Sequence, residues 1–330
     1  MILRLMAQLL LATTLLQVYP YDAGMVERYA TLPSSELRQP GAFEAMALLR
    51  AGLPAAPDAS RAPKKIDPNS VGVVTSAVSA IVVDRATGSV LYEKNGEEPR
   101  SIGSITKLMT AFVFLKGNPD LTSPTALQAS DVRSGGVQHV SVGDTVTVDN
   151  LLHASLVGSD NSATAALVRL SGLSEGNFVA KMNETAAELG MRATTFLDPT
   201  GLSADNRSIP SDLVRLLDAA MKVGVIREAT EQPVTTFVGS SGRVYSIDTT
   251  DELLNSFLNQ APYKVVGGKT GFLPEAGYCL GSLVSEKDAH EIVVVVLGSE
   301  TITGRFQDVK ALSAWTYKVF EWPDEKTSTL

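Results

Sequence analysis

Apolar and polar residues alternate in two short stretches in the first third of the chain. The segments "AVSAIVVD" and "GSVLYEKN" flank the turn-forming "RATG", and this pattern predicts a β-hairpin. From residue 103 to about residue 230 the apolar residues instead recur every three to four positions, as in "SITKLMTAFVFLKG", "DNLLHASLVG" and "PSDLVRLLDAAMKVG". That spacing predicts a block of amphipathic helices.

Strand-like patterns return after the helical block. They are found in "PVTTFVGSSGRVYSID", "GYCLGSLVSE" and "HEIVVVVLGSE", and a final amphipathic pattern, "RFQDVKALSAWTYKVF", predicts a closing helix. Short turns join these strands, and such turns are typical of antiparallel neighbours. We therefore expect an α+β fold in which a helical part, about 103–230, is inserted between an early hairpin and the late strands of a mainly antiparallel sheet.

The N-terminal part has a different composition. Residues 5–21 carry no charge and are mostly apolar, which predicts a signal peptide or membrane anchor over 1–22. Either would export the rest of the chain. Residues 23–70 are rich in Ala and Pro and are interpreted as a linker. We assign the folded domain to 71–323.

Composition limits the partners and the chemistry. The formal net charge of −8 argues against nucleic acid as a partner. The single cysteine, Cys279, lies in an apolar stretch and is expected in the core. The three histidines, His139, His153 and His290, are scattered without metal-ligand spacing, so we expect no metal.

Three short motifs carry the candidate chemistry. Ser104 precedes Lys107 by three residues where a helical pattern begins, so the two side chains share one face about a turn apart. A Ser-Asp-Asn triplet, 159–161, and a Lys-Thr-Gly triplet, 269–271, follow. Each motif alone is common, because Ser-Asp-Asn is an ordinary helix cap and Lys-Thr-Gly an ordinary turn. Their combination in this order is specific.

With this set of motifs the sequence resembles the penicillin-recognising serine hydrolases. Within that group it is most similar to the D-alanyl-D-alanine carboxypeptidase family, peptidase family S11, over about residues 75–320. The resemblance extends to "MNETAAELGM", "TTFLDPTGLS" and "GGKTGFLPEAGYCLGSL". It implies a β-lactamase/transpeptidase-like fold, peptidoglycan stem peptides ending in D-Ala-D-Ala as substrates, inhibition by β-lactam antibiotics such as penicillins, and no cofactor.

The residue types agree with an acyl-transfer reaction. Ser104 would attack the peptide carbonyl, and a serine hydroxyl needs a base to take its proton. Lys107 is placed for that role if it is neutral, which requires burial or a nearby like charge such as that of Lys269. Gly271 would allow a strand to approach the substrate closely.

The resemblance assigns the remaining roles. Ser159 would pass a proton to the leaving nitrogen, and Asn161 would hold the substrate amide and Lys107. Lys269 and Thr270 would bind the terminal carboxylate. The backbone N–H groups of Ser104 and Phe272 would form an oxyanion hole. Asp160 receives no chemical role.

Three alternatives to the carboxypeptidase stay open. Shorter members of the family include endopeptidases that cut peptide cross-links, and we expect no C-terminal β-rich domain in this chain. A class A β-lactamase would share the motifs, but it needs a Glu-x-x-Leu-Asn segment about 35 residues after Ser-Asp-Asn. Here only "DELLN" at 251–255 is similar. The third alternative is a non-catalytic cell-wall scaffold. We expect an extracytoplasmic enzyme, secreted or tethered to the cytoplasmic membrane by its N-terminus.

Overall fold

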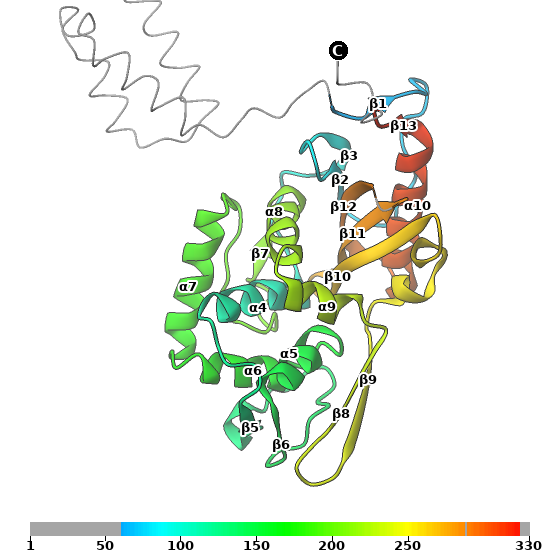
Figure 1. Cartoon of the computed structure of the whole chain (residues 1–330). Helices are drawn as coiled ribbons and strands as arrows, with labels where there is room; N and C mark the ends of the chain where they lie inside the picture. Colours follow the sequence, from blue (N-terminus) through cyan, green and yellow to red (C-terminus); the bar gives the residue numbers. More distant parts are fainter. Residues whose placement is uncertain (1–60, 288, 324–330) are drawn as a thin grey trace, which may run out of the picture. The chain divides into compact units, whose positions relative to one another are not determined.

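A five-stranded antiparallel sheet forms the centre of the computed structural model, which describes residues 61–323 except residue 288 (Figure 1). The strand order is β10–β11–β12–β2–β3, and all neighbours are antiparallel. The expected early hairpin is confirmed, and it pairs with the late strands through β2 and β12. The strands are β2 (Ser79–Asp84), β3 (Val90–Lys94), β10 (Tyr263–Leu273), β11 (Gly277–Glu286) and β12 (His290–Ser299).

The sheet is covered on both faces. Alternate residues of a strand point to opposite faces, so Ile81 and Val293 pack in the core on the helical side, while Val82 and Val294 pack against α10 (Ile302–Val319). Figure 1 shows α10 on one face and α8 and α4 on the other. Burial on both faces explains the nearly continuous apolar run in β12.

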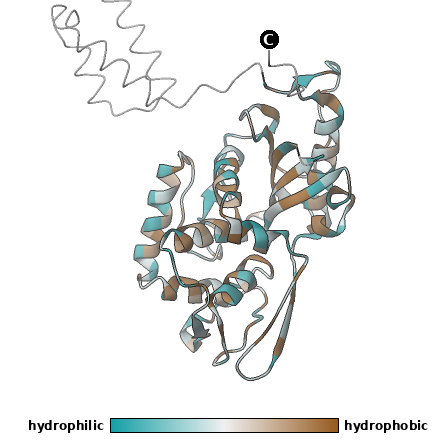
Figure 2. Ribbon diagram, viewed as in Figure 1, coloured by the Kyte–Doolittle hydropathy of each residue, from teal (hydrophilic) through white to brown (hydrophobic). Residues whose placement is uncertain are grey.

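The helical part is confirmed as one block of helices, and it is interrupted by the short hairpin of β5 (Pro124–Ala126) and β6 (Thr145–Thr147). Figure 2 shows hydrophobic residues on the strands of the sheet and along the inner helices. Helix α4 is central to this block, because each of the other helices of the block contacts it. The helices are α4 (Thr106–Lys116), α5 (Val148–Leu156), α6 (Asn161–Leu170), α7 (Glu175–Glu188), α8 (Pro210–Met221) and α9 (Gly224–Glu231).

Two features differ from the sequence-based expectation. A strand was expected to begin at Lys269-Thr270-Gly271, but the edge strand β10 already begins at Tyr263, because the glycines in its "VVGGKTG" weaken the strand pattern. The pattern at "PVTTFVGSSGRVYSID" does form strands, β8 (Val234–Val238) and β9 (Val244–Asp248), but they make a ribbon of their own rather than joining the sheet. Alternation predicts a strand but not the partner with which it pairs.

The predicted targeting segment 1–22 and residues 23–60 of the predicted linker lie outside the described residues. Within the described part of that linker, β1 (Lys64–Lys65) pairs with β13 (Phe320–Glu321) at the end of α10. A second short pair joins β4 (Arg100–Ser101) to β7 (Arg207–Ser208). None of the helices in the described part of the chain is long and apolar enough to span a membrane.

Candidate active site

The hydroxyl of Ser104 and the amine of Lys107 lie together where α4 begins. Ser104 belongs to a 3₁₀ turn, η2 (Gly103–Ile105), which runs directly into α4. The three-residue spacing brings both side chains to one face, and Lys107 Nζ is 2.9 Å from Ser104 Oγ. Ser104 is half-buried, whereas Lys107 is completely buried. The hydroxyl of Ser104 can therefore contact a ligand that comes from solvent, while the amine of Lys107 is shielded from water.

Two further oxygens surround the amine of Lys107. Asn161 Oδ1 and the backbone carbonyl of Thr200 each lie 2.6 Å from Nζ. A neutral primary amine has two N–H donors and one lone pair, and these two oxygens can only accept. When both N–H groups are used in this way, the lone pair is left for the hydroxyl of Ser104. The geometry therefore suits proton transfer from Ser104 to Lys107.

The electrostatic environment favours a neutral Lys107. Burial lowers the pKa of its amine to about 7, and the negative charges of Asp198 and Asp160 oppose this shift. Repulsion between the two lysines was expected to act on Lys107; in the structure it contributes to the lowered pKa of Lys269. Near neutral pH a substantial fraction of Lys107 is thus able to act as a base.

Asp160 has a structural role in the second motif. Its carboxylate accepts hydrogen bonds from the N–H groups of Ser162 (2.7 Å) and Ala163 (3.0 Å), and it thereby caps α6. Its other oxygen accepts from the N–H of His139 at 2.7 Å. These contacts fix the start of α6 and the loop beside it.

The neighbours of Asp160 differ in how firmly they are tied to Lys107. Asn161 begins α6, and its amide bridges Lys107 Nζ and the carbonyl of Gly135. Ser159 has a φ of +59°, a left-handed conformation that is uncommon outside glycine and is often found at functional sites. In the described residues the Ser159 side chain makes no hydrogen bond with the other motif residues, so only its chain neighbours bring it to the site.

The third motif lies within β10. Lys269 is buried, and its Nζ approaches only the carbonyl (3.3 Å) and hydroxyl (3.4 Å) oxygens of Thr270. Burial, together with the positive charges of Lys107 and Arg305, lowers the pKa of Lys269 well below its usual value. The hydroxyl of Thr270 shares a hydrogen bond of 2.7 Å with that of Thr250. An anionic ligand at this end of β10 would favour the protonated form of Lys269.

Two glycines allow β10 to contact the backbone that carries Ser104. A Cβ atom on Gly271 would lie 2.2 Å from the carbonyl oxygen of Ile102, and one on Gly103 would lie 2.7 Å from the backbone nitrogen of Phe272. No larger residue fits at either position without a shift of the backbone. The side chain of Phe272 stacks on Tyr278 with ring centroids 4.4 Å apart and stays 45% exposed.

The structure adds residues that the motifs did not indicate. Arg305 from α10 is buried and donates a hydrogen bond to the carbonyl of Gly271 at 3.2 Å, and its Nε atom has no partner in the described part of the chain. Asp251 is also buried, and burial raises its pKa to about 6. Asp198 and Thr200 complete the surroundings of Lys107. From the sequence alone, Arg305 was only one position in an amphipathic helix.

The glutamate considered for a β-lactamase reaction and the histidines considered as metal ligands do not form a second site. Glu252 is the glutamate of "DELLN", the segment that is similar to the β-lactamase motif. Its side chain is exposed in η4 (Glu252–Asn255). His153 lies in α5 and His290 begins β12, whereas His139 lies in the loop before β6. Among residues 61–323, residue 288 aside, no three His, Cys, Asp or Glu side chains are grouped to hold a metal ion. Cys279 is buried in β11, as expected.

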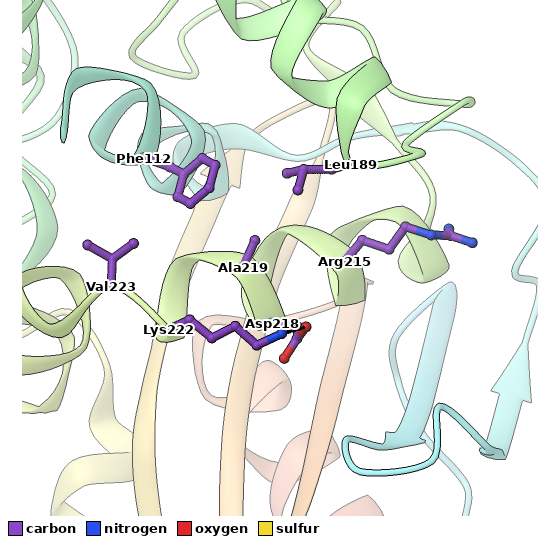
Figure 3. A pocket seen from close by; sticks show the side chains of 7 residues that line it. All are labelled: Phe112, Leu189, Arg215, Asp218, Ala219, Lys222 and Val223. Atoms are coloured by element: carbon purple, nitrogen blue, oxygen red, sulfur yellow. Dashed lines mark hydrogen bonds and ion pairs between the residues drawn. The ribbon is translucent and has the colours of Figure 1, made fainter. Parts of the chain in front are cut away.

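A hollow of about 510 Å³ lies along α8 and contains none of the motif residues. Figure 3 shows Arg215 and Asp218 on α8 and Lys222 directly after its end, with Phe112 and Leu189 opposite. Asp218 is already paired with Lys222 at 2.7 Å and with Arg85 at 2.9 Å. The chemistry-bearing residues gather instead between α4, α6 and β10.

Comparisons with known proteins relate this chain to one family. Residues 67–301 match the profile of peptidase family S11, described as D-alanyl-D-alanine carboxypeptidase. A D-alanyl-D-alanine endopeptidase of Pseudomonas aeruginosa is 33% identical over 241 residues, which cover 72% of this chain and 76% of that protein. A D-alanyl-D-alanine carboxypeptidase of Streptomyces is 32% identical over 251 residues, with 71% and 84% covered.

The fold is similar to solved structures as well. The cefotaxime-bound penicillin-binding protein D2 of Listeria monocytogenes superposes with a TM-score of 0.65 at 29% identity, and the match covers 76% of this chain and all of that one. The expected transpeptidase-like α+β fold is thus confirmed. Because the family profile spans most of the chain, the chain belongs to the D-alanyl-D-alanine carboxypeptidase family, peptidase family S11.

Proposed function

We propose that this chain is a serine-type D-Ala-D-Ala carboxypeptidase that acts on peptidoglycan stem peptides through an acyl-enzyme on Ser104. The observation that carries the proposal is the 2.9 Å contact between Ser104 Oγ and Lys107 Nζ, combined with two acceptors at 2.6 Å that use the other N–H groups of the amine. A buried amine in this arrangement is a competent general base for a serine nucleophile.

The proposed reaction begins with attack on the carbonyl between the two D-Ala residues. Lys107 takes the proton of Ser104 as Oγ bonds to the carbonyl carbon, and the N–H groups of Ser104 and Phe272 stabilise the oxyanion. Ser159 passes the proton from Lys107 to the nitrogen of the terminal D-Ala as the C–N bond breaks, so that Ser159 and Lys107 both return to their starting protonation states. Water then hydrolyses the ester, which releases the shortened peptide and the free Ser104 hydroxyl.

The substrate is held by groups of opposite charge. Lys269 and Thr270 bind the terminal carboxylate, and Arg305 adds a second buried positive charge beside them. Asn161 holds the substrate amide as well as Lys107. No cofactor takes part. The Lys269 amine and the Arg305 guanidinium are buried without a complete set of protein acceptors, which supports an anionic ligand at this end of β10, because unpaired buried polar groups are costly.

The proposed location is extracytoplasmic. Peptidoglycan lies outside the cytoplasm, and residues 1–22 would serve as a signal peptide or as a membrane anchor, followed by the linker 23–70 and the peptidase domain 71–323. Inhibition by β-lactams is part of the proposal, since a cefotaxime-bound structure is among the similar folds. Penicillin mimics the D-Ala-D-Ala terminus and would acylate the same serine.

The proposal is tested by intact-protein mass spectrometry after the chain is mixed with benzylpenicillin, with Ser104→Ala as the control variant. We expect a one-to-one adduct that lasts minutes or longer in the parent chain and none in the variant. Fast penicillin turnover without a lingering adduct would instead indicate a β-lactamase. The absence of any reaction would indicate a non-catalytic scaffold.

A second candidate is a D,D-endopeptidase that cuts peptide cross-links. It is favoured by three relatives that bear the name D-alanyl-D-alanine endopeptidase, from Pseudomonas aeruginosa, Haemophilus influenzae and Escherichia coli. The two activities are separated by giving the acylation-competent chain either a monomeric pentapeptide or a cross-linked dimer. Release of D-Ala from the monomer supports the carboxypeptidase, and cleavage of the dimer alone supports the endopeptidase.

A further inference from the structure

A single carboxylate organises the turn that faces the amine of Lys107. Asp198 Oδ1 accepts hydrogen bonds from the N–H groups of Thr200 (2.6 Å) and Gly201 (2.8 Å) and from the hydroxyl of Thr200 (2.5 Å). Oδ2 accepts from the N–H of Ser203 at 2.7 Å. Consecutive N–H groups that converge on one acceptor fix the backbone of a turn, and here they fix residues 198–203.

The same turn presents its carbonyl oxygens to α4. Thr200 O accepts from Lys107 Nζ, and Pro199 O accepts from the hydroxyl of Thr110, which lies one helical turn further along α4. The amide of Asn206 fastens the turn from behind, because its Nδ2 donates to the carbonyl of Asp198 at 2.8 Å. The position of the Thr200 carbonyl is therefore determined by Asp198 and its immediate contacts.

The Thr200 carbonyl matters because it orients the base. In neutral Lys107, one N–H is directed to Asn161 and the other to Thr200, so that the lone pair faces Ser104. If the Thr200 carbonyl moved away, the amine could rotate about its terminal bond and the lone pair would no longer have one direction. Loss of orientation in a reacting pair lowers the rate even when both groups are present.

Asp198 also contributes a charge. The charged groups around Lys107 are Asp198 from this turn, Asp160 at the start of α6 and Lys269 on β10; Ser104 and Asn161 are neutral neighbours. Hydrogen bonds to Thr200 and Ser203 keep the pKa of Asp198 below its usual value despite partial burial, so it is an anion at neutral pH. An anion stabilises the protonated form of Lys107.

We propose that Asp198 is a positioning residue for acylation: it holds the Thr200 carbonyl on the Lys107 amine and places a negative charge beside the base. This inference rests on the proposed function of Ser104 and Lys107. In this arrangement one residue links two properties of the base, its orientation and the pH at which it loses its proton.

The test is the benzylpenicillin acylation rate of Asp198→Asn, followed by intact-protein mass spectrometry between pH 5 and pH 9. In the parent chain the rate should fall below about pH 7, where Lys107 becomes protonated. In the variant the midpoint should move to lower pH by about one unit, because the lost anion no longer favours the protonated amine. The rate on the high-pH plateau should fall about tenfold, since the turn and its carbonyl are held less firmly.

Asp84→Asn is the matched control. Asp84 is a buried aspartate that also fixes a turn, through the N–H and hydroxyl of Thr87, but it lies on β2. Its replacement should leave the midpoint unchanged. If Asp198→Asn slows acylation by the same factor at every pH, or changes nothing, the inference is overturned. A parent chain that forms no adduct would contradict the proposed function instead.

Asp198→Glu tests the inference independently of whether the asparagine variant folds. It keeps the negative charge and displaces the carboxylate by one methylene group. We expect a midpoint close to that of the parent chain together with a reduced plateau rate. An unchanged plateau rate in a folded Asp198→Glu protein would contradict the positioning role.

Discussion

The two lysines of the site are equally buried but differently bonded. Lys107 and Lys269 are 0% and 1% exposed, and both have lowered pKa values. Lys107 Nζ has three oxygens within 2.9 Å. Lys269 Nζ has only two, at 3.3 and 3.4 Å, both from the adjacent Thr270. These two distances are longer than those of well-formed N–H···O hydrogen bonds.

The difference in hydrogen bonding separates two functions, a general base and a binding group for an anion, which equal burial would not distinguish. An amine with all its donors used has a fixed direction, which suits a base that must meet one hydroxyl. An amine with unused donors in a dry site gains most from an incoming anion, because a buried, unsatisfied cation is costly until a partner arrives. We therefore read the α4 side of the site as the reacting side and the β10 side as the side that binds the carboxylate.

Replacement of the base should have the largest effect. Lys107→Met keeps the length and apolar stem of the side chain but removes the amine, so Ser104 has no group to take its proton. We expect the acylation rate with benzylpenicillin to fall by about 10³-fold or more, in the range of lost general-base catalysis. Stopped-flow or mass-spectrometric acylation rates measure this directly.

The same variant should affect all substrates alike. A peptide that ends in D-Ala-D-Ala and its C-terminally amidated form should lose activity by the same factor, because the base does not contact the terminal carboxylate. A larger loss for the free carboxylate would mean that Lys107 also binds the anion. The thermal midpoint of the variant serves as the control for folding.

Replacement of the second lysine should have an intermediate effect and a different signature. Lys269→Gln removes the positive charge while keeping a polar side chain of similar reach. We expect KM for the carboxylate peptide to rise roughly 10- to 100-fold with a smaller change in kcat, as for a lost charged hydrogen bond of about 1.5–3 kcal/mol.

The amidated peptide provides the matched comparison for Lys269. In the parent chain it should be a poorer substrate than the free acid, and in Lys269→Gln that preference should largely disappear. This is a double-mutant cycle between the protein and the substrate. If the preference for the free acid survived unchanged in the variant, the β10 lysine would not be the carboxylate partner.

Much of this arrangement was predictable from local patterns. The three-residue spacing of Ser104 and Lys107 predicts contact on one helix face, and the helical periodicity predicts most of α4 to α8. The Ser-Asp-Asn triplet is of a kind that often caps helices, and its Asp160 caps α6. These features depend on residues within a few positions of one another, so the sequence contains them directly.

What could not be predicted depends on contacts between distant segments. The backbone carbonyl of Thr200 contacts Lys107, which lies 93 positions earlier in the chain. Because every residue has a backbone carbonyl, the residue type does not indicate such a contact. Arg305 reaches Gly271 from the far side of the sheet. The first half of β10 was not predicted, because Gly267 and Gly268 weaken the strand pattern, and what they meet are the distant residues Thr230, Met221 and Gly281.

Replacement of Thr250 should have the smallest effect on the kinetics, and that effect should be confined to the binding side. Its hydroxyl shares a 2.7 Å hydrogen bond with Thr270, and its backbone N–H donates to the carbonyl of Val157 in the helical part. Thr250→Val keeps the shape but leaves the Thr270 hydroxyl free to rotate, so its donor no longer has one direction. We expect KM for the carboxylate peptide to rise by only about threefold, the cost of one weak hydrogen bond, with kcat unchanged.

The control for Thr250→Val is Thr236→Val, which makes the same change at an exposed position of β8. It should leave both kinetic constants unchanged. Because Thr250 contacts the β10 side and not Lys107, the acylation midpoint near pH 7 should also stay in place. A shifted midpoint would show that the two sides of the site are coupled, and the division between a reacting side and a binding side would then have to be abandoned.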